Sequence, residues 1–311
     1  MHIRDHQIKP EYRQVVMKVQ NYINQNLTGD VSLETLAGIA NYSSFHFQKI
    51  FTEAVLETPK QYVIRLRLER AAHLIRIFPD LAINEIASGC GFSSNSIFSR
   101  AFKNYYGISA EIFRKLPDKK IQEIKKRHLF ASEEEIPWIN PISDIQEKIL
   151  SVKLSSPPVI STMYPFQIAC FQTTLSHREN ISFAFRSLFQ WAIPKNLITN
   201  STKYFGIWLD FPFLTRFDKC RYLCGIELTS DIKPSGGISV LSFNKGQYLN
   251  YRMIGDINET LDSLIVLNHN FVDSMGYSIS EMICFEQFEE SPIIKTYEKI
   301  QRNLLIPVRI K

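Results

Sequence analysis

Short polar side chains and one arginine follow a tight turn in the stretch 81–107. Asn95, Ser96, Ser99 and Arg100 fall on the outer face of the helix expected after this turn. Amide, hydroxyl and guanidinium groups are the side chains that hydrogen-bond to base edges and phosphates in the major groove of DNA. The spacing of these four residues therefore predicts a helix that reads nucleic acid.

Two short amphipathic segments flank the turn and must position these side chains. Apolar residues recur at helical spacing in both segments, with Ile86 in the first and Phe98 in the second. Gly91 lies in the turn, where a residue without Cβ adopts positive φ at little cost. Ala87 is small enough for two helices to approach closely, and Ser93 is the candidate N-cap of the second helix. This order of elements predicts a helix-turn-helix unit.

The same pattern occurs about 50 residues earlier in the chain. In the earlier copy Asn41 takes the position of Gly91, and Asn is the non-glycine residue that best tolerates a left-handed turn. A repeat of this period indicates two copies of one supersecondary unit. The first copy contributes Leu36, Ala37, Tyr42, Ser43 and Ser44, which correspond in order to Ile86, Ala87, Phe92, Ser93 and Ser94 of the second copy. After a shift of one residue, the correspondence continues with Lys49 and Arg100, Phe51 and Phe102, and Thr58 and Ser109.

Further helices are expected around the two copies. A helix over 11–27 precedes the first copy, and a short helix capped by Ser109 follows the second. Between the copies, Thr58 and Pro59 begin one long helix that Pro79 ends near residue 78. We expect this helix to fix the distance and the angle between the two units.

The charge of the chain is concentrated in the part that carries the repeat. Residues 1–127 contain 19 Lys and Arg against 12 Asp and Glu, a net charge of +7, whereas the rest of the chain has a net charge of −2. This asymmetry suits a polyanionic partner for the first half only. A solvated basic surface would give the same count, so the charge alone does not decide between the two.

Several classes of protein do not fit the sequence. No run of about 18 uncharged apolar residues is present, and the first residues lack the apolar core of a signal peptide. The five cysteines have no spacing typical of a metal site. We therefore expect a cytoplasmic, nucleoid-associated protein with reduced cysteines, no metal and no cofactor.

The composition changes after residue 116. Residues 117–155 combine a basic run, three consecutive glutamates and several prolines, which indicates a linker with short helices around 119–130 and 142–150. The remainder indicates an α+β domain with an antiparallel sheet, helices on one face, a duplicated β-α-β-β order and a pocket between the two copies. Strands are expected over 159–164, 168–173, 204–209, 221–228, 238–243, 247–253, 282–288 and 304–310, and helices over 183–192 and 260–275.

Residues 8–116 resemble the DNA-binding domain of AraC/XylS-family transcription regulators. The similarity rests on the second unit and its flank, Ile86-Ala87-x3-Gly91-Phe92-Ser93-x4-Phe98-Ser99-Arg100-x-Phe102-Lys103-x3-Gly107 followed by Ser109-Ala-Glu-Ile-Phe-Arg114. Leu56 stands where the family usually has Gly, and Ala110 stands where it usually has Pro. Both departures concern the turn geometry at the far end of each unit.

The resemblance implies that the first reading helix presents Phe45, Gln48 and Lys49 to DNA. Gln pairs with adenine, Lys reaches guanine or phosphate, and Phe packs on a thymine methyl group. Two such helices on one chain would enter successive major grooves about 34 Å apart, so that a monomer reads a whole site. Two alternatives remain open, since Phe45 could be a core aromatic and Arg100 could pair with a carboxylate.

Residues 156–311 resemble the GyrI-like effector-binding domain, as in the Rob subgroup of regulators. This family implies a hydrophobic pocket that binds lipophilic or cationic effectors over an acidic residue, and Glu286 matches that position. Trp191, Trp208, Tyr248 and Phe288 are the candidate walls, although Glu286 could instead pair with a nearby Lys or Arg and the aromatic residues could be plain core. The similarity rests on Gly246-Gln-Tyr, Gly255-Asp256, Gly276-Tyr277, Phe285-Glu286-x-Phe288 and Ile306-Pro307-Val308.

The sequence thus predicts an all-α double helix-turn-helix domain (8–116), a linker (117–155) and an α+β GyrI-like domain (156–311). We expect a bacterial transcription activator or repressor whose partners are promoter DNA, RNA polymerase and a small effector. The alternatives are a GyrI-like hydrolase with Glu286 as the base, a protein-interaction module with a degenerate pocket, and a DNA-repair methyltransferase. The last would need a reactive cysteine in a polar setting, yet Cys170, Cys220, Cys224 and Cys284 lie in apolar runs. The operator, the effector and the oligomeric state are not encoded in any recognisable pattern.

Overall fold

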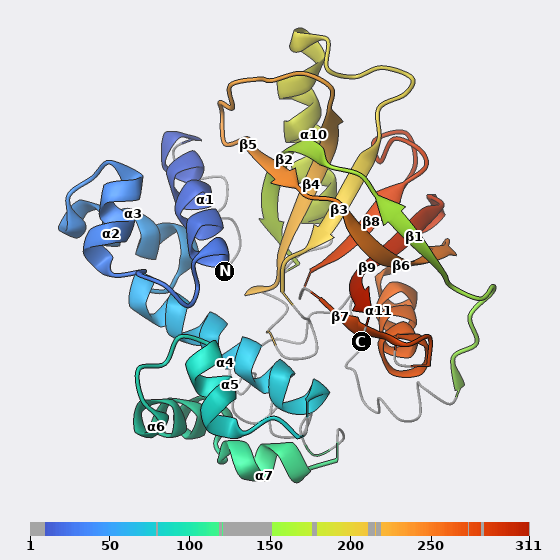
Figure 1. The fold of residues 1–311 in the computed structure, drawn as a ribbon. Helices are drawn as coiled ribbons and strands as arrows, with labels where there is room; N and C mark the ends of the chain where they lie inside the picture. Colours follow the sequence, from blue (N-terminus) through green and yellow to red (C-terminus); the bar gives the residue numbers. More distant parts are fainter. Residues whose placement is uncertain are drawn as a thin grey trace. The chain divides into compact units, whose positions relative to one another are not determined.

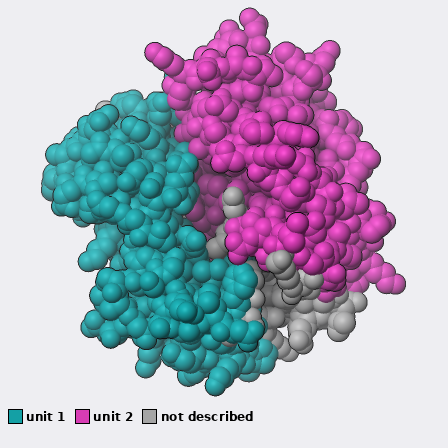
Figure 2. All heavy atoms as spheres, viewed as in Figure 1, with its two compact units in different colours: residues 1–132, 235–237 teal, residues 133–234, 238–311 magenta. Residues whose placement is uncertain are grey.

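The structure is a computed structural model that describes residues 10–78, 80–117, 120, 151–175, 179–210, 215, 219–272, 274–280 and 283–310. Two compact units make up the chain, residues 1–132 with 235–237 and residues 133–234 with 238–311 (Figure 2). Pro79 and nearly all of the two predicted linker helices lie outside the described residues. None of the helices described is both long and apolar enough to span a bilayer.

The first unit is all-helical, as the sequence predicts (Figure 1). Helices α2 and α3 form one helix-turn-helix, α5 and α6 form the second, and α4 runs between them and packs against α3, α5, α6 and α7. The helices are α1 (Pro10–Gln25), α2 (Leu33–Ala40), α3 (Ser44–Val55), α4 (Pro59–Ile77), α5 (Ile83–Gly89), α6 (Asn95–Tyr106) and α7 (Ala110–Lys115).

The two turns have the same local geometry. Asn41 has φ 58° and Gly91 has φ 87°, and the next residue in each turn donates its backbone N–H to an alanine carbonyl five residues earlier at 3.1 Å. Ser43 caps α3, but the cap of α6 is Ser94, whose side chain accepts from the backbone N–H of Ile97. The prediction of Ser93 as the cap was therefore wrong. The second turn therefore contains one more residue than the first, and this extra residue, Ser93, directly precedes the cap Ser94.

Leu56, which ends α3, is held in a left-handed conformation that favours glycine. Its φ is 60° and its side chain is 63% exposed, so the side chain contributes little packing to offset the backbone strain. We expect Leu56→Gly to raise the free energy of unfolding of the first unit by about 0.5–1 kcal/mol. Chemical denaturation followed by far-ultraviolet circular dichroism, which is dominated by the helices, would measure the change.

The exposed position Glu53, in the right-handed interior of the same helix, provides the control for this substitution. Glu53→Gly should lower the free energy of unfolding by about 1 kcal/mol, because glycine weakens an ordinary helical position. Equal losses for both substitutions would show that the conformation of Leu56 carries no strain.

The second unit is α+β. Its strands are β1 (Val159–Met163), β2 (Phe166–Thr174), β3 (Tyr204–Trp208), β4 (Arg221–Leu228), β5 (Ser239–Phe243), β6 (Gly246–Met253), β7 (Tyr277–Ile279), β8 (Cys284–Phe288) and β9 (Arg302–Ile310). Its helical elements are α10 (Glu179–Ala192), η1 (Ile193–Lys195), α11 (Ile257–Val266), η3 (Leu267–Phe271) and η4 (Tyr297–Lys299). The short strand β7 is absent from the sequence-based prediction.

All strand pairs of the sheet are antiparallel, in the order β1-β6-β9-β8-β3-β4-β2-β5, with β7 beside β9. The predicted duplication is confirmed, since β2-α10-β3-β4 and β6-α11-β8-β9 follow the same order. The strand that precedes each repeat is exchanged: β1 pairs with β6 of the second repeat, and β5 pairs with β2 of the first.

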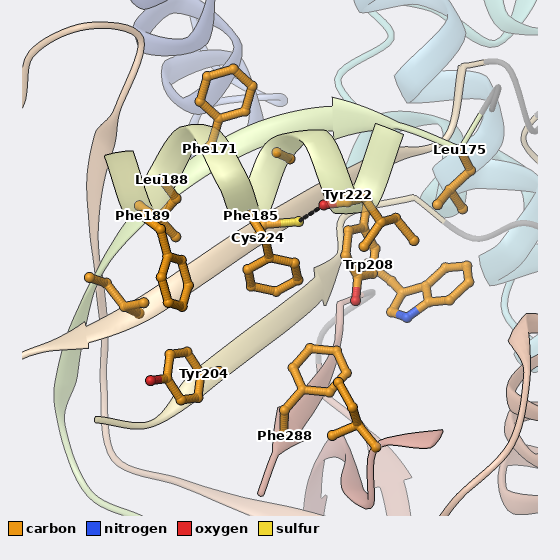
Figure 3. Close-up of a cluster of buried hydrophobic side chains, with 14 of the residues drawn as sticks. Phe171, Leu175, Phe185, Leu188, Phe189, Tyr204, Trp208, Tyr222, Cys224 and Phe288 are labelled. Carbon is orange, nitrogen blue, oxygen red and sulfur yellow. Dashed lines mark hydrogen bonds between the residues drawn. The ribbon is translucent and has the colours of Figure 1, made fainter. Parts of the chain in front are cut away.

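Helices α10 and α11 cover the same face of the sheet, because residues of both belong to one buried cluster with β2, β3 and β4. Figure 3 shows part of this cluster, with Phe185 of α10 and with Trp208, Tyr222 and Phe288 of the sheet. A separate buried cluster on the other face contains Phe205, Tyr248 and Phe285 among others. The alternation of side chains along β8 therefore sends neighbouring residues into different cores.

Candidate functional site

The outer face of α3 carries the three residues expected to read DNA. Phe45 is 84% exposed, and Gln48 and Lys49 are also exposed. Phe45 is therefore not a core aromatic, whereas Phe47 and Phe51 one turn apart are fully buried. The exposure of Phe45 leaves its ring available to contact a partner.

The outer face of α6 carries the matching set. Asn95, Ser96 and Arg100 are exposed and Ser99 is half-buried. The Arg100 side chain folds back along the helix, where Nε donates to the carbonyl oxygen of Ser96 at 3.4 Å. Within the described residues no carboxylate pairs with Arg100, which leaves its charge available to a partner.

The basic residues of the two exposed faces lie at the same distance from the start of their helices. Lys49 and Arg100 each lie six residues after the serine that caps their helix. A cation on the exposed face of each helix favours a negatively charged partner. Both helices can thus place a cation and polar groups against DNA with the same geometry.

His46 lies at the start of α3 and belongs to an aromatic group. Its ring stacks on Tyr42 with centroids 4.9 Å apart and contacts the edge of Tyr12 at 6.2 Å. In the described part of the chain, no group of three or more His, Cys, Asp or Glu residues is placed to hold a metal. His46 therefore acts here as a ring that packs α3 against its neighbours.

Glu286 of β8 forms the polar centre of the second unit. Its side chain has no solvent exposure, and three donors bind its carboxylate. Trp208 Nε1 donates to Oε2 at 2.9 Å, the Tyr222 hydroxyl donates to Oε2 at 2.6 Å, and the Tyr297 hydroxyl donates to Oε1 at 2.5 Å. Such a set of donors stabilises a buried carboxylate only if its charge is also balanced.

Arg302, the first residue of β9, balances this charge. Its Nε lies 2.8 Å from Glu286 Oε1, both side chains are fully buried, and the guanidinium lies over the Tyr297 ring at 4.2 Å. The two Nη atoms donate to Thr260 and to the carbonyl oxygens of Gly255, Tyr297 and Ile300. Burial lowers the pKa of Arg302, but Tyr297 and Glu286 outweigh burial and leave it above its usual value.

A glycine makes room for this centre. Gly206 of β3 lies directly opposite Glu286, and a Cβ at Gly206 would lie 1.7 Å from the Tyr222 hydroxyl oxygen. No other residue fits there without displacing Tyr222. The side chain of Tyr222 therefore reaches the carboxylate across the gap that the missing Cβ leaves.

The structure places Trp208 and Phe288 in one buried cluster with Trp191 packed against it, but it places Tyr248 in another cluster. Trp208 binds Glu286 directly, and Phe288 packs at 6.1 Å against the ring of Tyr297. Trp191 is half-buried near the end of α10, with the Lys195 ammonium over its ring at 5.1 Å. Tyr248 belongs to the cluster on the opposite face of the sheet.

Three residues of this centre were not predicted from the sequence: Tyr222, Tyr297 and Arg302. A signal for Arg302 exists, because it shares the phase of the apolar residues Leu304 and Ile306, which lie in one buried cluster. A charged residue in that phase requires a buried partner of opposite charge. No comparable signal marks Tyr297, which reaches Glu286 from a short 3-10 helix.

The two tyrosines make the second unit sensitive to alkali. Burial, followed by the charge of Glu286, raises the pKa of Tyr222 well above its usual value, and burial also raises that of Tyr297. The folded unit then retains protons that the unfolded chain loses above about pH 10. Stability is fully present below that pH and should fall above it by up to about 1.4 kcal/mol per pH unit for each tyrosine.

Tryptophan fluorescence would follow this transition, since Trp138, Trp191 and Trp208 all lie in residues 133–311. Tyr222→Phe should be less stable at neutral pH, because it loses the hydrogen bond to Glu286, but its stability should fall less steeply above pH 10. The same slope in both proteins would show that Tyr222 does not hold its proton in the folded state.

Comparison with known proteins bears on both units. Residues 36–116 match the family described as a helix-turn-helix domain, and residues 156–309 match the GyrI-like small molecule binding domain. The HTH-type transcriptional activator AarP of Providencia stuartii is 30% identical over 100 residues, which cover 32% of this chain and 73% of AarP. The chain belongs to the AraC-type helix-turn-helix family of transcriptional regulators.

Two other proteins show the range of similarity to this AraC-type regulator. The probable transcriptional regulator LumQ of Photobacterium leiognathi is 40% identical over 93 residues, 29% of this chain and 36% of LumQ. The regulator thus spans about a third of the length of LumQ. The solved C-terminal domain of EcmrR has 11% sequence identity and a TM-score of 0.42, over 51% of this chain and 100% of that domain.

Proposed function

We propose that this AraC-type regulator binds promoter DNA sequence-specifically, with α3 and α6 as its two reading helices. The observation that carries the proposal is the exposure of Lys49 and Arg100 at equivalent positions of two helices that begin at the same kind of cap. The net charge of +7 in residues 1–127 supports a polyanionic partner.

Each reading residue has a distinct role in this proposal. Lys49 and Arg100 bind guanine or phosphate. The side-chain amides of Gln48 and Asn95 bind adenine, and the Phe45 ring packs on a thymine methyl group. Helix α4, with 19 residues, is about 28 Å long, which is comparable to one turn of DNA. A monomer therefore reads both half-sites. The remaining proposed contacts are Phe45, Gln48, Asn95, Ser96 and Ser99.

Footprinting on the DNA upstream of the gene tests the proposal. Two protected segments about one helical turn apart are expected, with an affinity that falls steeply as the salt concentration rises. A duplex of scrambled sequence is the control. Equal affinity for the scrambled and the upstream duplex would contradict sequence-specific binding.

We further propose that the regulator acts at the nucleoid and activates transcription by contact with RNA polymerase. The name of AarP as a transcriptional activator supports this direction. In transcription with purified RNA polymerase, added regulator should raise the yield from its own upstream promoter. A lower yield would instead identify a repressor.

For the second unit we propose a small lipophilic or cationic effector, with Glu286 as the polar anchor and Trp208 and Phe288 as walls. The match to the GyrI-like small molecule binding domain and the aromatic setting of the carboxylate support it. Because Arg302 already balances the charge of Glu286, a cation must compete with Arg302, whereas a neutral ligand need only share the hydrogen bonds.

A thermal-shift titration with tetraphenylphosphonium and with the neutral triphenylphosphine oxide separates these cases. Each protein is compared with its own ligand-free melting temperature. Glu286→Gln should reduce the shift, whereas Tyr248→Phe, on the opposite face of the sheet, should not. Equal shifts for Glu286→Gln and the parent would show that Glu286 is not the anchor.

We propose that the regulator is not an enzyme. A general base must take a proton from the substrate, whereas the Glu286 carboxylate already accepts three hydrogen bonds and its charge is balanced by Arg302. Burial raises the pKa of Cys90 to about 11 and that of Cys170 to about 12, which leaves little thiolate for a methyl transfer. A hydrolysis assay of the parent and of Glu286→Gln should show no difference.

A further inference from the structure

Arg67 of α4 ties the first helix-turn-helix unit to the connecting helix. Its Nε donates to the carbonyl oxygen of Leu27 at 2.8 Å, and its Nη2 donates to that of Gly29 at 3.5 Å. These two carbonyls belong to the segment between α1 and α2. The guanidinium thus provides hydrogen-bond donors to backbone carbonyls of a connecting segment that lies outside both helices.

Gly91 brings the turn of the second unit to the same place. A Cβ at Gly91 would lie 2.9 Å from the carbonyl oxygen of Leu27 and 2.9 Å from Nε of Arg67. Cβ atoms essentially never come that close to other atoms, so Gly91 is required here for contact as well as for its φ of 87°. Segments from both units and from α4 therefore meet at one point.

The other arginines of α4 serve different contacts. Arg76 donates to the carbonyl oxygens of Arg114 and Leu116 at 3.0 and 2.9 Å, at the end of α7, which follows the second helix-turn-helix. Arg65 pairs with Glu57 and Glu69, and Glu69 accepts a hydrogen bond from Tyr105 of α6. The Arg76 contacts involve only the side of the second helix-turn-helix, whereas the Arg65 network runs from Glu57, next to α3, through Glu69 to Tyr105 of α6. The contact at Arg67 differs because the turn at Gly91 packs directly on the segment between α1 and α2.

We propose that this clasp, made by Leu27, Gly29, Arg67 and Gly91, fixes the spacing of the two reading helices and makes Arg67 a positioning residue for DNA recognition. The inference rests on the proposed function. Helix α4 packs against helices of both helix-turn-helix units, and the clasp adds a point at which segments of the two units meet directly, which limits their movement relative to each other. The regulator therefore recognises the distance between two half-sites as well as their sequences.

Binding to duplexes of altered spacing tests the proposal. One base pair inserted or removed between the half-sites shifts them by about 3.4 Å and rotates them by about 35°. The parent should lose about tenfold or more in affinity on both altered duplexes, because one reading helix loses its base contacts. Arg67→Ala should bind all three duplexes within about threefold of one another, a difference below about 0.7 kcal/mol.

Arg70→Ala is the matched control, because Arg70 lies on the same helix and makes no hydrogen bond within the described residues. It removes the same charge and should retain the preference of the parent for the native spacing. The proposal is overturned if Arg67→Ala retains that preference, or if the parent itself tolerates both altered duplexes.

A measurement without DNA separates the clasp from the proposed function. Spin labels on cysteines introduced at the exposed positions Glu53 of α3 and Asn104 of α6 report the distance between the reading helices. Four of the five native cysteines are buried and the fifth is half-buried, which limits their labelling. Double electron–electron resonance should give a narrow distance distribution in the parent and a broad one in Arg67→Ala. Equal widths would overturn the clasp even if DNA binding is confirmed, and a failure of DNA binding alone would leave this result valid.

Discussion

Replacing both Lys49 and Arg100 by alanine is expected to abolish specific DNA binding at working concentrations. Each side chain is exposed on a reading helix and is available for one base contact worth about 1–3 kcal/mol. The two residues lie on different helices, so their losses should add to about 2–6 kcal/mol, or at least about a 30-fold loss of affinity. A gel-shift titration at fixed salt, on the footprinted duplex, measures the loss.

The single variants and a surface control locate the effect. Each single substitution should lose about half of the free energy, and Lys60→Ala, an exposed lysine at the start of α4, should bind like the parent. Binding at several salt concentrations separates the two kinds of contact, since losing a phosphate contact lowers the salt dependence of the affinity, whereas losing a base contact leaves it unchanged. Unchanged affinity in Arg100→Ala would exclude a base contact by the second reading helix.

Arg302→Leu is expected to lower the free energy of unfolding of the second unit by about 3–5 kcal/mol. The substitution leaves the Glu286 carboxylate buried and charged without its only ion-pair partner in the described residues. It also leaves the carbonyl oxygens of Gly255 and Ile300 without the donors that Arg302 supplies. Unfolding followed by tryptophan fluorescence reports this unit alone, because every tryptophan lies in it.

The double variant Glu286→Leu with Arg302→Leu is the informative comparison. If the loss in Arg302→Leu comes from an unbalanced charge, removing the carboxylate as well should restore much of the stability. Glu286→Gln with Arg302 intact should also be destabilised, because it leaves the guanidinium unbalanced. A double variant as unstable as the sum of both single variants would show that the two charges do not interact.

The first unit was predictable from the sequence because its local signals agree with one another. Thr58, Pro59 and Ser109 mark helix starts, and the apolar period marks the buried faces. The cap of α6 was misplaced because Ser93 and Ser94 are both serines and either could cap. The repeat shows that an extra residue precedes Arg100 but not on which side of the cap it lies, and the structure places it before Ser94.

The buried centre of the second unit was only half predictable. Glu286 was singled out by a resemblance, and the alternative of a pairing with a basic residue is what the structure shows, with Arg302 as the partner. Pairing across strands depends on sheet order, and the order of these strands is not local information. Tyr248 and Glu286 lie on opposite faces for the same reason, because the face of a strand residue follows from register and not from residue type.

The exchanged strands have a consequence for the integrity of the second unit. β1 is held by β6 and β5 is held by β2, so each repeat contributes its leading strand to the other. A protease that cut the segment between β4 and β5 would produce two fragments, each still hydrogen-bonded to a strand of its neighbour. The two fragments of the nicked protein should therefore remain associated until the protein is denatured. Fragments produced separately should fold only when they are mixed, because each supplies a strand that the other needs.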